Sequence, residues 1–246
     1  MSATTAVLKA ETRLFTREPG SLFWVLAFPS LLLLAFGLVP KFREADPALG
    51  GERALDVYVP SVVLVALITA SLLSMPGALT TYRERGVLRR VRATPARPSS
   101  LLLAQVVLHA VAAVLGALLA LAVGRFAWDV ALPEHRLAYG LTLLLATLAG
   151  LATGTVITAL ARTARAAQAI GLAAFFPSMF AAGVYVPIQV LPQSLRQVVE
   201  VFPFGAAAQA LDRAASGSWP TWTHLAVLVL WTVVLTAVAV RWFRWE

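Results

Sequence analysis

Six arginines and one glutamate stand together in the segment from Arg83 to Arg97, RERGVLRRVRATPAR. Long runs without any Asp, Glu, Lys or Arg precede and follow it, over residues 57–82 and 98–124. Guanidinium groups bind carboxylates through paired hydrogen bonds, and the apolar residues between these arginines add surface that a partner protein can grip. The segment therefore predicts the docking of a partner rather than a reaction. The alternative is that these arginines only set the orientation of the chain.

The chain lacks the patterns of the common catalytic and metal sites. It has no cysteine, which excludes disulfides, thiolate metal sites and cysteine nucleophiles. Neither Lys9 nor Lys41 follows a glycine, so there is no Walker A loop for phosphate binding. No HExxH motif occurs, and no pair of carboxylates lies inside an apolar run. We therefore expect no catalytic, cofactor-binding or metal-binding residue, and no enzymatic activity.

The elements that must position the arginine segment are long and apolar. Of the 246 residues, 59% are hydrophobic and 13% are charged, whereas about a quarter are charged in soluble domains. Six stretches of 22 to 30 residues carry no charge at all. About 20 apolar residues cross a bilayer core, and a charge there costs about 2.5–3.5 kcal/mol. We predict an all-α integral membrane protein with a single domain, 1–246, and six transmembrane helices. These cover about residues 22–39, 57–79, 101–123, 138–160, 166–186 and 225–240.

Two further segments are predicted to be helical without crossing the membrane. Residues 4–18 resemble an amphipathic interfacial helix, with Lys9, Arg13 and Arg17 facing lipid phosphates; a frayed polar tail is the alternative. Residues 187–213 are rich in proline, too short to cross and too apolar for a free loop. We expect an external helical hairpin there, re-entrant or lying on the surface, before the last span. Tryptophans that mark the interface flank that span at Trp219, Trp222, Trp242 and Trp245.

Three features inside the spans predict local geometry. Pro29 predicts a kink in the first span. Gly150 and Gly154 form a GxxxG pattern, which lets two helix backbones approach closely in lipid. His109 is the one titratable residue deep in a span. A lone intramembrane histidine can be functional, but we favour hydrogen-bonded packing, with Gln105 one turn earlier as its neighbour.

The distribution of charge predicts the orientation. With six spans, both termini, the loop 82–97 and the loop with Arg162 and Arg165 lie on one side. That side has 13 basic and four acidic residues, and the other has seven basic and eight acidic residues. Since basic loops stay in the cytoplasm, both termini are predicted to be cytoplasmic. The 18 arginines against two lysines suggest a GC-rich bacterial genome, hence the bacterial cytoplasmic (inner) membrane.

The positions of the acids bear on the source of energy. All 12 acidic residues lie outside the predicted spans, whereas ion-coupled carriers bind the coupling ion with intramembrane carboxylates. Energy must then come from a partner, or none is used. An ion-coupled or passive carrier or channel, and a membrane enzyme or assembly factor, stay open as alternatives. Nucleic-acid binding is not expected, because no basic platform interleaved with aromatic residues is present.

Several segments resemble, in their order and spacing, the membrane-spanning permease subunits of the type-2 ABC exporter family, which includes bacterial drug, polyketide and polysaccharide exporters. Residues 11–37 resemble the family's interfacial helix running into the first span, and Glu84–Arg90 with Thr94-Pro95 resemble its first cytoplasmic loop. Ala182 departs from the small polar residue of many relatives. Further similar segments are Phe176–Phe180, Gly183, Pro187, Leu191-Pro192, Phe202-Pro203 and Asp212-Arg213.

The resemblance implies a half-transporter that pairs with a second permease half, a homodimer in our prediction, and with ATP-binding-cassette subunits that hold ATP and Mg. It implies outward transport of an amphipathic drug-like, lipid or lipid-linked compound. The role of the ATPase-coupling helix falls on Glu84, Arg85, Gly86, Leu88, Arg89 and Arg90. Secondary contacts fall on Lys9, Arg13, Arg17 and the loop 162–165. A path between the halves would be lined by the second and fifth spans, with Thr69, Ser74, Phe176 and Met179 as candidates.

Overall fold

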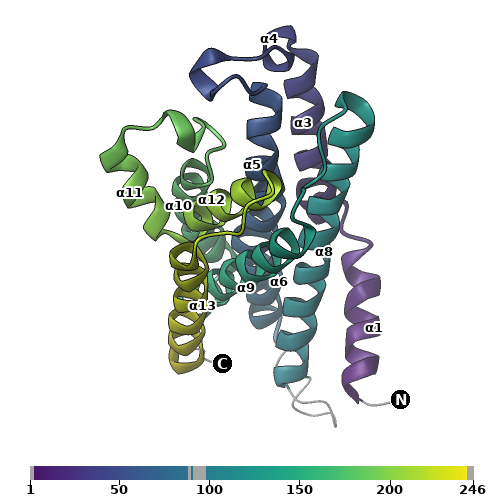
Figure 1. Ribbon diagram of the computed structural model, residues 1–246. Coiled ribbons are helices and arrows are strands. Elements are labelled where there is room, and N and C mark those ends of the chain that lie inside the picture. Colours follow the sequence, from purple (N-terminus) through teal and green to yellow (C-terminus); the bar gives the residue numbers. More distant parts are fainter. Residues whose placement is uncertain (1–2, 88–89, 91–97, 243–246) are drawn as a thin grey trace.

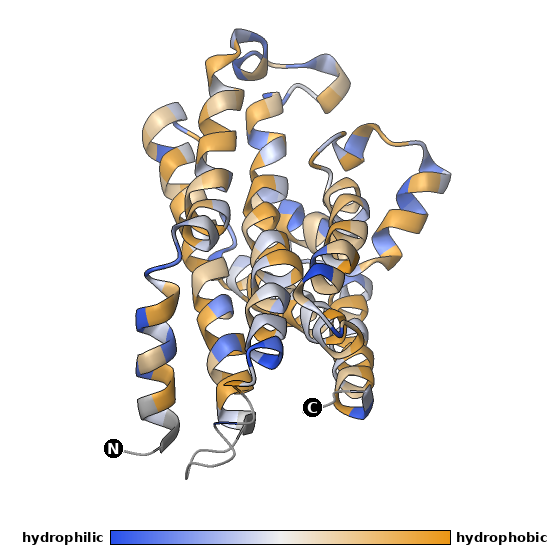
Figure 2. Ribbon diagram, turned by 180° about the vertical axis from the view of Figure 1, so that it is seen from behind, coloured by the Kyte–Doolittle hydropathy of each residue, from blue (hydrophilic) through white to orange (hydrophobic). Residues whose placement is uncertain are grey.

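The computed structural model of the chain describes residues 3–87, 90 and 98–242. In these residues the regular elements are all helical, which confirms the predicted all-α class. Long, mostly apolar helices form the body of the molecule, and hydrophilic residues gather toward its ends (Figure 2). The start of α1 and the end of α13 lie at the same end of the molecule (Figure 1).

One continuous helical segment forms the centre of the bundle. It consists of α5 (Ala54–Ile68), the π-helix η3 (Thr69–Ser74) and α6 (Met75–Glu84). Every residue from 59 to 72 is buried, although the segment is apolar enough to lie in lipid. The helices α3, α8, α9, α10 and α12 all contact it. The second predicted span is therefore the core of the protein rather than a lipid-facing helix.

The other predicted spans surround this core. The first consists of α2 (Pro19–Leu22), the π-helix η1 (Phe23–Ala27) and α3 (Phe28–Leu38). Three more are α8 (Pro98–Trp128), α9 (Arg136–Leu160) and α13 (Trp222–Trp242). With the central segment, they make five helices of the described chain that are long and apolar enough to cross a membrane. The predicted fifth span forms α10 (Ala164–Ala181), which lies outside this set, so the count of six is not confirmed.

Two prolines account for the irregular turns in these spans. Pro29 comes two residues after η1, and Pro76 comes two residues after η3. Proline has no N–H, so the carbonyl four residues earlier loses its usual helical donor. Those carbonyls belong to Val25 and Leu72, inside the two π-helices. The irregularity predicted at Pro29 thus takes the form of a widened turn just before the proline.

Glycines on neighbouring helices make room for both widened turns. A Cβ atom added to Gly116 of α8 would overlap the Val25 oxygen, and one added to Gly171 of α10 would lie 2.5 Å from the Leu72 oxygen. Carbonyls without a helical donor are costly in lipid, where no water can replace the bond. Close backbone contact therefore shields these turns, and only glycine permits that approach.

The GxxxG pattern of α9 packs against the π-helix η3. Gly150 lies against the Ser71 side chain, and a Cβ on Gly154 would overlap the Ser71 backbone oxygen. The side chain of Ser71 donates to the Leu67 oxygen at 2.6 Å within its own helix. The predicted role of Gly150 and Gly154 in helix packing is confirmed, and the partner is the central segment.

At the end away from the termini, the chain forms α4 (Pro40–Arg43) and two 3₁₀ turns, η2 (Pro47–Leu49) and η4 (Ile188–Val190). The segment predicted as a hairpin contains α11 (Gln193–Val201) and α12 (Pro203–Ala215), joined at Phe202. Ten residues of α12 are buried, and it contacts α5, α9 and α13. This segment is thus packed into the body rather than being a free loop.

Polar side chains connect the hairpin to the last span. Arg196 donates to Glu200 at 2.9 Å and to Gln209 at 3.2 Å, and Glu200 lies 3.8 Å from the His224 ring. Burial raises the pKa of the Asp212 carboxyl, partly offset by a hydrogen bond from Gln189 and by nearby arginines. The network holds α11, α12 and α13 together.

At the other end, α1 (Ala3–Phe15) forms where residues 4–18 were predicted to be helical. It lies alongside the part of α8 that is nearer the termini, with its axis along α8 (Figure 1). Lys9 and Arg13 of α1 and Arg17 just after it are exposed, while Glu11 is buried. The contact face of α1 is thus against protein, and its place relative to lipid stays a prediction.

The two ends of α9 supply a test of the packing. We expect Gly154→Ala to destabilise the protein by about 1–3 kcal/mol, because the new methyl group meets the Ser71 backbone, which cannot turn aside. Gly140→Ala is the matched control on the same helix, since nothing lies within 4 Å of its added Cβ. It should be neutral or stabilising by up to about 1 kcal/mol. Thermal unfolding in detergent measures both, and equal stabilities would contradict the packing.

Candidate functional site

The first described residues of the arginine segment end α6 and form a tight turn after it. The Arg85 N–H donates to the Thr81 oxygen and the Gly86 N–H to the Arg83 oxygen, which ends α6. Gly86 has a φ of +64°, a left-handed conformation that favours glycine. Glycine at this position is therefore required by the turn itself.

After Gly86 the backbone forms one more hydrogen bond of the helical i to i−4 type. The Arg90 N–H donates to the Gly86 oxygen at 3.2 Å, and the Arg90 Nη2 donates to the Arg85 oxygen at 2.9 Å. Glu84, Arg85 and Arg90 are exposed, and Gly86 is partly exposed. The described members of the predicted coupling set thus face outward, where a partner can reach them. The other two, Leu88 and Arg89, lie outside the described residues.

The end of α6 is bonded to the loop between α9 and α10. Arg83 Nη1 donates to the Ala161 oxygen at 2.7 Å and to the Thr158 oxygen at 3.2 Å. These carbonyls are at the C-terminal end of α9, where cations are stabilised by unpaired oxygens and by the helix dipole. Arg83 is only partly exposed, so water competes less for these hydrogen bonds. One arginine therefore joins the second and fourth spans.

Glu84 makes the reciprocal contact with the next helix. Its Oε1 accepts the Ala164 N–H at 3.0 Å, at the first turn of α10. A carboxylate at a helix N-terminus satisfies a free N–H and complements the dipole. The sequence predicted Glu84 as a docking residue and the loop 162–165 as a secondary contact. The structure brings the two together and gives Glu84 an intramolecular role that the sequence did not reveal.

A second connection joins α1 to the same region. Glu11 is 6% exposed, and its Oε2 accepts Tyr82 Oη–H at 2.7 Å and Gln105 Nε2–H at 2.5 Å. Glu11 is one of the four acidic residues predicted on the side of the termini, outside the spans. Its helical spacing of four from both Val7 and Phe15 was the available signal, because it places Glu11 on the apolar stripe. The carboxylate ties α1 to the second and third spans.

His109 forms a polar junction close to this connection. Its Nδ1 lies 2.9 Å from the Gln105 backbone oxygen, and its Nε2 lies 3.1 Å from Ser74 Oγ. Ser74 Oγ also donates to Ser21 Oγ at 3.1 Å, and the Phe15 ring meets the imidazole edge-on at 5.2 Å. Both ring nitrogens have partners, as the packing interpretation of His109 requires. Gln105 takes part through its backbone, not its side chain.

The four residues predicted for a path do not share one surface of the single chain. Thr69 and Met179 are buried, at 2% and 5% exposed, while Phe176 is 57% exposed. Ser74 is half-buried and bonded to the first and third spans. Their role in a path therefore stays a prediction.

Comparison with known proteins supplies a family. The model of the ABC-2 type transporter family matches residues 2–214, from α1 to the end of α12. No curated protein matches the chain. The matched region includes every contact described at this end of the molecule.

The buried carboxylate of α1 can be tested directly. We expect Glu11→Leu to lower the unfolding temperature, because Tyr82 and Gln105 lose their shared acceptor and unpaired buried donors cost about 1–3 kcal/mol. Glu11→Gln keeps one acceptor oxygen and should lose less. Circular dichroism during heating in detergent is the measurement. The matched change at exposed Glu18, Glu18→Leu, should have little effect, and equal losses at both positions would count against this role.

Proposed function

This chain belongs to the ABC-2 type transporter family, and on that premise we propose that it is one half of an exporter driven by a separate ATPase. Membership makes it a multi-pass membrane protein and the transport domain of an ABC exporter. The proposal adds that an ATP-binding-cassette subunit, which holds ATP and Mg, docks on residues 84–90. The observation that carries it is the direct continuity of exposed Glu84 and Arg85 with the buried central helix.

Docking on this segment would move the core of the protein. The segment begins where α6 ends, and α6 continues without a break into η3 and α5. A push at Arg85 or Arg90 is therefore applied to a helix that contacts most of the others. The bonds of Arg83 and Glu84 pass the same displacement to α9 and α10. A transporter whose energy source is another chain needs such a rigid connection to transmit movement from the docking site to its helices.

The membrane topology in this proposal has six crossings. The start of α1 and the end of α13 lie at one end of the molecule (Figure 1), which requires an even number. The sixth is α10, whose 18 residues carry Arg165 in the first turn and Pro177 near the end. The charge in its first turn makes α10 less apolar than the other five helices. The external part between α10 and α13 is then the hairpin of α11 and α12.

The charge distribution supports a cytoplasmic position for the end that carries both termini. Its described cations include exposed Arg85, Arg90, Arg162 and Arg165. Under the positive-inside rule this end faces the cytoplasm. We place the protein in a bacterial cytoplasmic membrane with both termini inside, which puts residues 84–90 on the side where ATP is available.

A second permease half would complete the transporter, and we propose a copy of this chain. The exposed face of α10 carries Gln168, Leu172 and Phe176, which share one side of the helix. A path between two copies would use this face. The central segment is buried by its own chain from Val59 to Leu72, and Leu73 and Ser74, which follow, are partly exposed and closer to such a path than buried Thr69.

An amphipathic substrate fits an apolar cavity of the chain. A cavity of about 470 Å³ lies between α10, α11, α12 and α13, and Phe180, Phe202 and Trp231 are among its lining residues. Among those lining residues only Thr153, Ser178 and Trp231 carry polar side-chain atoms. This environment suits the apolar part of a drug-like, lipid or lipid-linked compound. The outward direction of transport follows from the exporter family.

An ion-coupled or passive carrier is the competing function, and its ion-coupled form would need a buried ion-binding group. In the described part of the chain, Glu11 is the one acidic residue classed as buried. Its carboxylate is engaged by Tyr82 and Gln105 beside α1. This arrangement supports a structural carboxylate more than a coupling site.

The docking proposal predicts the effect of breaking the segment. We expect Leu88→Ala combined with Arg89→Glu to lower ATPase co-purification and ATP-dependent export by about tenfold or more, because apolar and charged anchors dominate docking energies. Lys41→Glu, an equal charge reversal at an exposed position on the opposite end, should leave both unchanged. Binding and export are measured with the permease and its ATPase reconstituted in vesicles.

Two outcomes would contradict the proposal. One is normal ATPase binding and export by the double variant, which would remove the docking role from residues 84–90. The other is transport or conductance by the purified permease alone without ATP, which would favour the carrier.

A further inference from the structure

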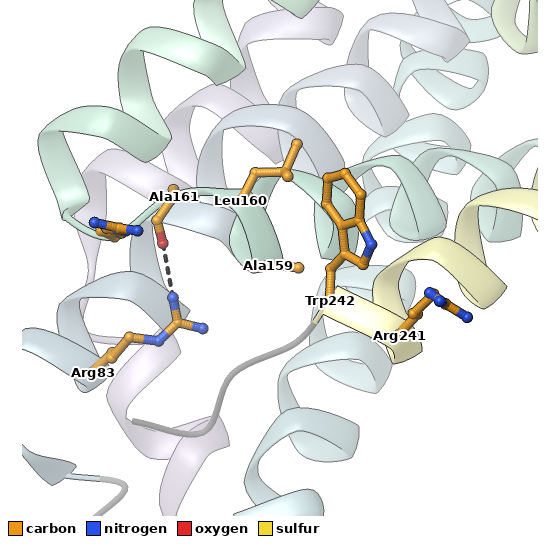
Figure 3. Close-up of a pocket in the computed structure, with 7 residues that line it drawn as sticks. Arg83, Ala159, Leu160, Ala161, Arg241 and Trp242 are labelled. Carbon is orange, nitrogen blue, oxygen red and sulfur yellow. Dashed lines mark hydrogen bonds between the residues drawn. The ribbon is translucent and has the colours of Figure 1, made fainter.

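A cavity of about 560 Å³ lies where α6, α9 and α13 end. Its lining residues come from three parts of the chain, and Figure 3 shows Arg83 on one side and Trp242 on the other. The volume is within the range of about 300–1,000 Å³ found for small-molecule sites. The lining residues are Arg83, Ala159, Leu160, Ala161, Arg162, Arg241 and Trp242.

The polar part of this lining is cationic. Arg83, Arg162 and Arg241 contribute three guanidinium groups, and none of the seven residues is acidic. A guanidinium presents a planar fork of N–H donors that matches the oxygens of a phosphate. The cavity is therefore complementary to an anion, and most of all to a phosphate group.

One of the three arginines is already held in place. Arg83 is partly buried, and its Nη1 donates to the Thr158 and Ala161 oxygens; the bond to Ala161 is drawn in Figure 3. A side chain fixed in this way loses little further freedom when a ligand binds. Arg162 and Arg241 are exposed, and in Figure 3 Arg241 lies beyond Trp242, at the rim of the cavity.

The other part of the lining is apolar and continues along a helix that faces outward. Leu160 is 45% exposed and Trp242 is 54% exposed. Further along α13, Leu230 and Val234 are 61% and 44% exposed, and they lie on the same side of the helix as Arg241, eleven and seven residues before it. Tryptophan is enriched where lipid head groups meet the hydrocarbon core. An anion that binds here thus has apolar surface beside it that extends into the membrane.

We infer that this cavity binds the phosphate head group of an anionic membrane phospholipid, whose acyl chains lie along α13. A cationic side and an apolar side match the two parts of such a lipid. The cationic lining disfavours a zwitterionic lipid, because the positive choline group would meet the same arginines. The inference requires only that α13 crosses the membrane, so it stands apart from the proposed ATPase docking.

The test uses the full chain in detergent with added lipid. Phosphatidylglycerol should raise the unfolding temperature and bind in native mass spectrometry, while phosphatidylcholine should do neither. The double variant Arg162→Gln/Arg241→Gln should weaken phosphatidylglycerol binding by about tenfold, because it removes two charge-assisted contacts from exposed positions. It spares Arg83, which also holds α9.

Arg165→Gln is the matched control. Arg165 is exposed and three residues from Arg162, but it does not line the cavity. Lipid binding should survive this change, and an equal loss at Arg165 would reduce the effect to general surface charge and overturn the inference. Full competition by millimolar inorganic phosphate would also overturn it, because the site would then take a free anion. Normal lipid binding by the double variant together with loss of ATPase binding would overturn it as well, because the cavity would then be part of the docking surface.

Discussion

The close contact of backbone with backbone around η3 is the constraint on which the fold depends. Pro76 cannot donate a hydrogen bond to the oxygens before it, and the turn that carries them widens into the π-helix η3. In an apolar interior those oxygens must be enclosed by protein. Gly154 of α9 and Gly171 of α10 enclose them from two sides, and no side chain larger than hydrogen fits there. The positions of α9 and α10 follow from this contact.

The same central helix gives the end near the termini its organisation. Three consecutive residues at its end, Tyr82, Arg83 and Glu84, bond to α1, to the end of α9 and to the start of α10. The bonds satisfy the buried carboxylate of Glu11, a carbonyl at the end of α9 and an N–H at the start of α10. Exposed Arg85, the next residue, is therefore joined directly to this set of bonds. A partner that bound there would act on the central helix.

Arginine has two separable roles at this end. Arg85 and Arg90 are exposed beside the turn at Gly86, whereas Arg83 is partly buried and caps α9. A count of charges treats them alike, because the positive-inside rule depends on number and side alone. Their surroundings separate them. Arg83 and Arg162 border a cavity that also has an apolar wall, and the inferred lipid site depends on this combination rather than on basic charge alone.

The sequence by itself determined the helical class, the presence and approximate places of five apolar spans, and the packing role of Gly150 and Gly154. Exclusion of charge and the spacing of small residues are local properties, and lipid enforces both. Only the tertiary structure decided that the second span is the core, that Glu11 is buried and that Glu84 caps α10. Such roles depend on which faces meet, and the partners of Glu11 are 71 and 94 residues away in the chain. Composition cannot specify that choice, because many faces of these helices are equally apolar.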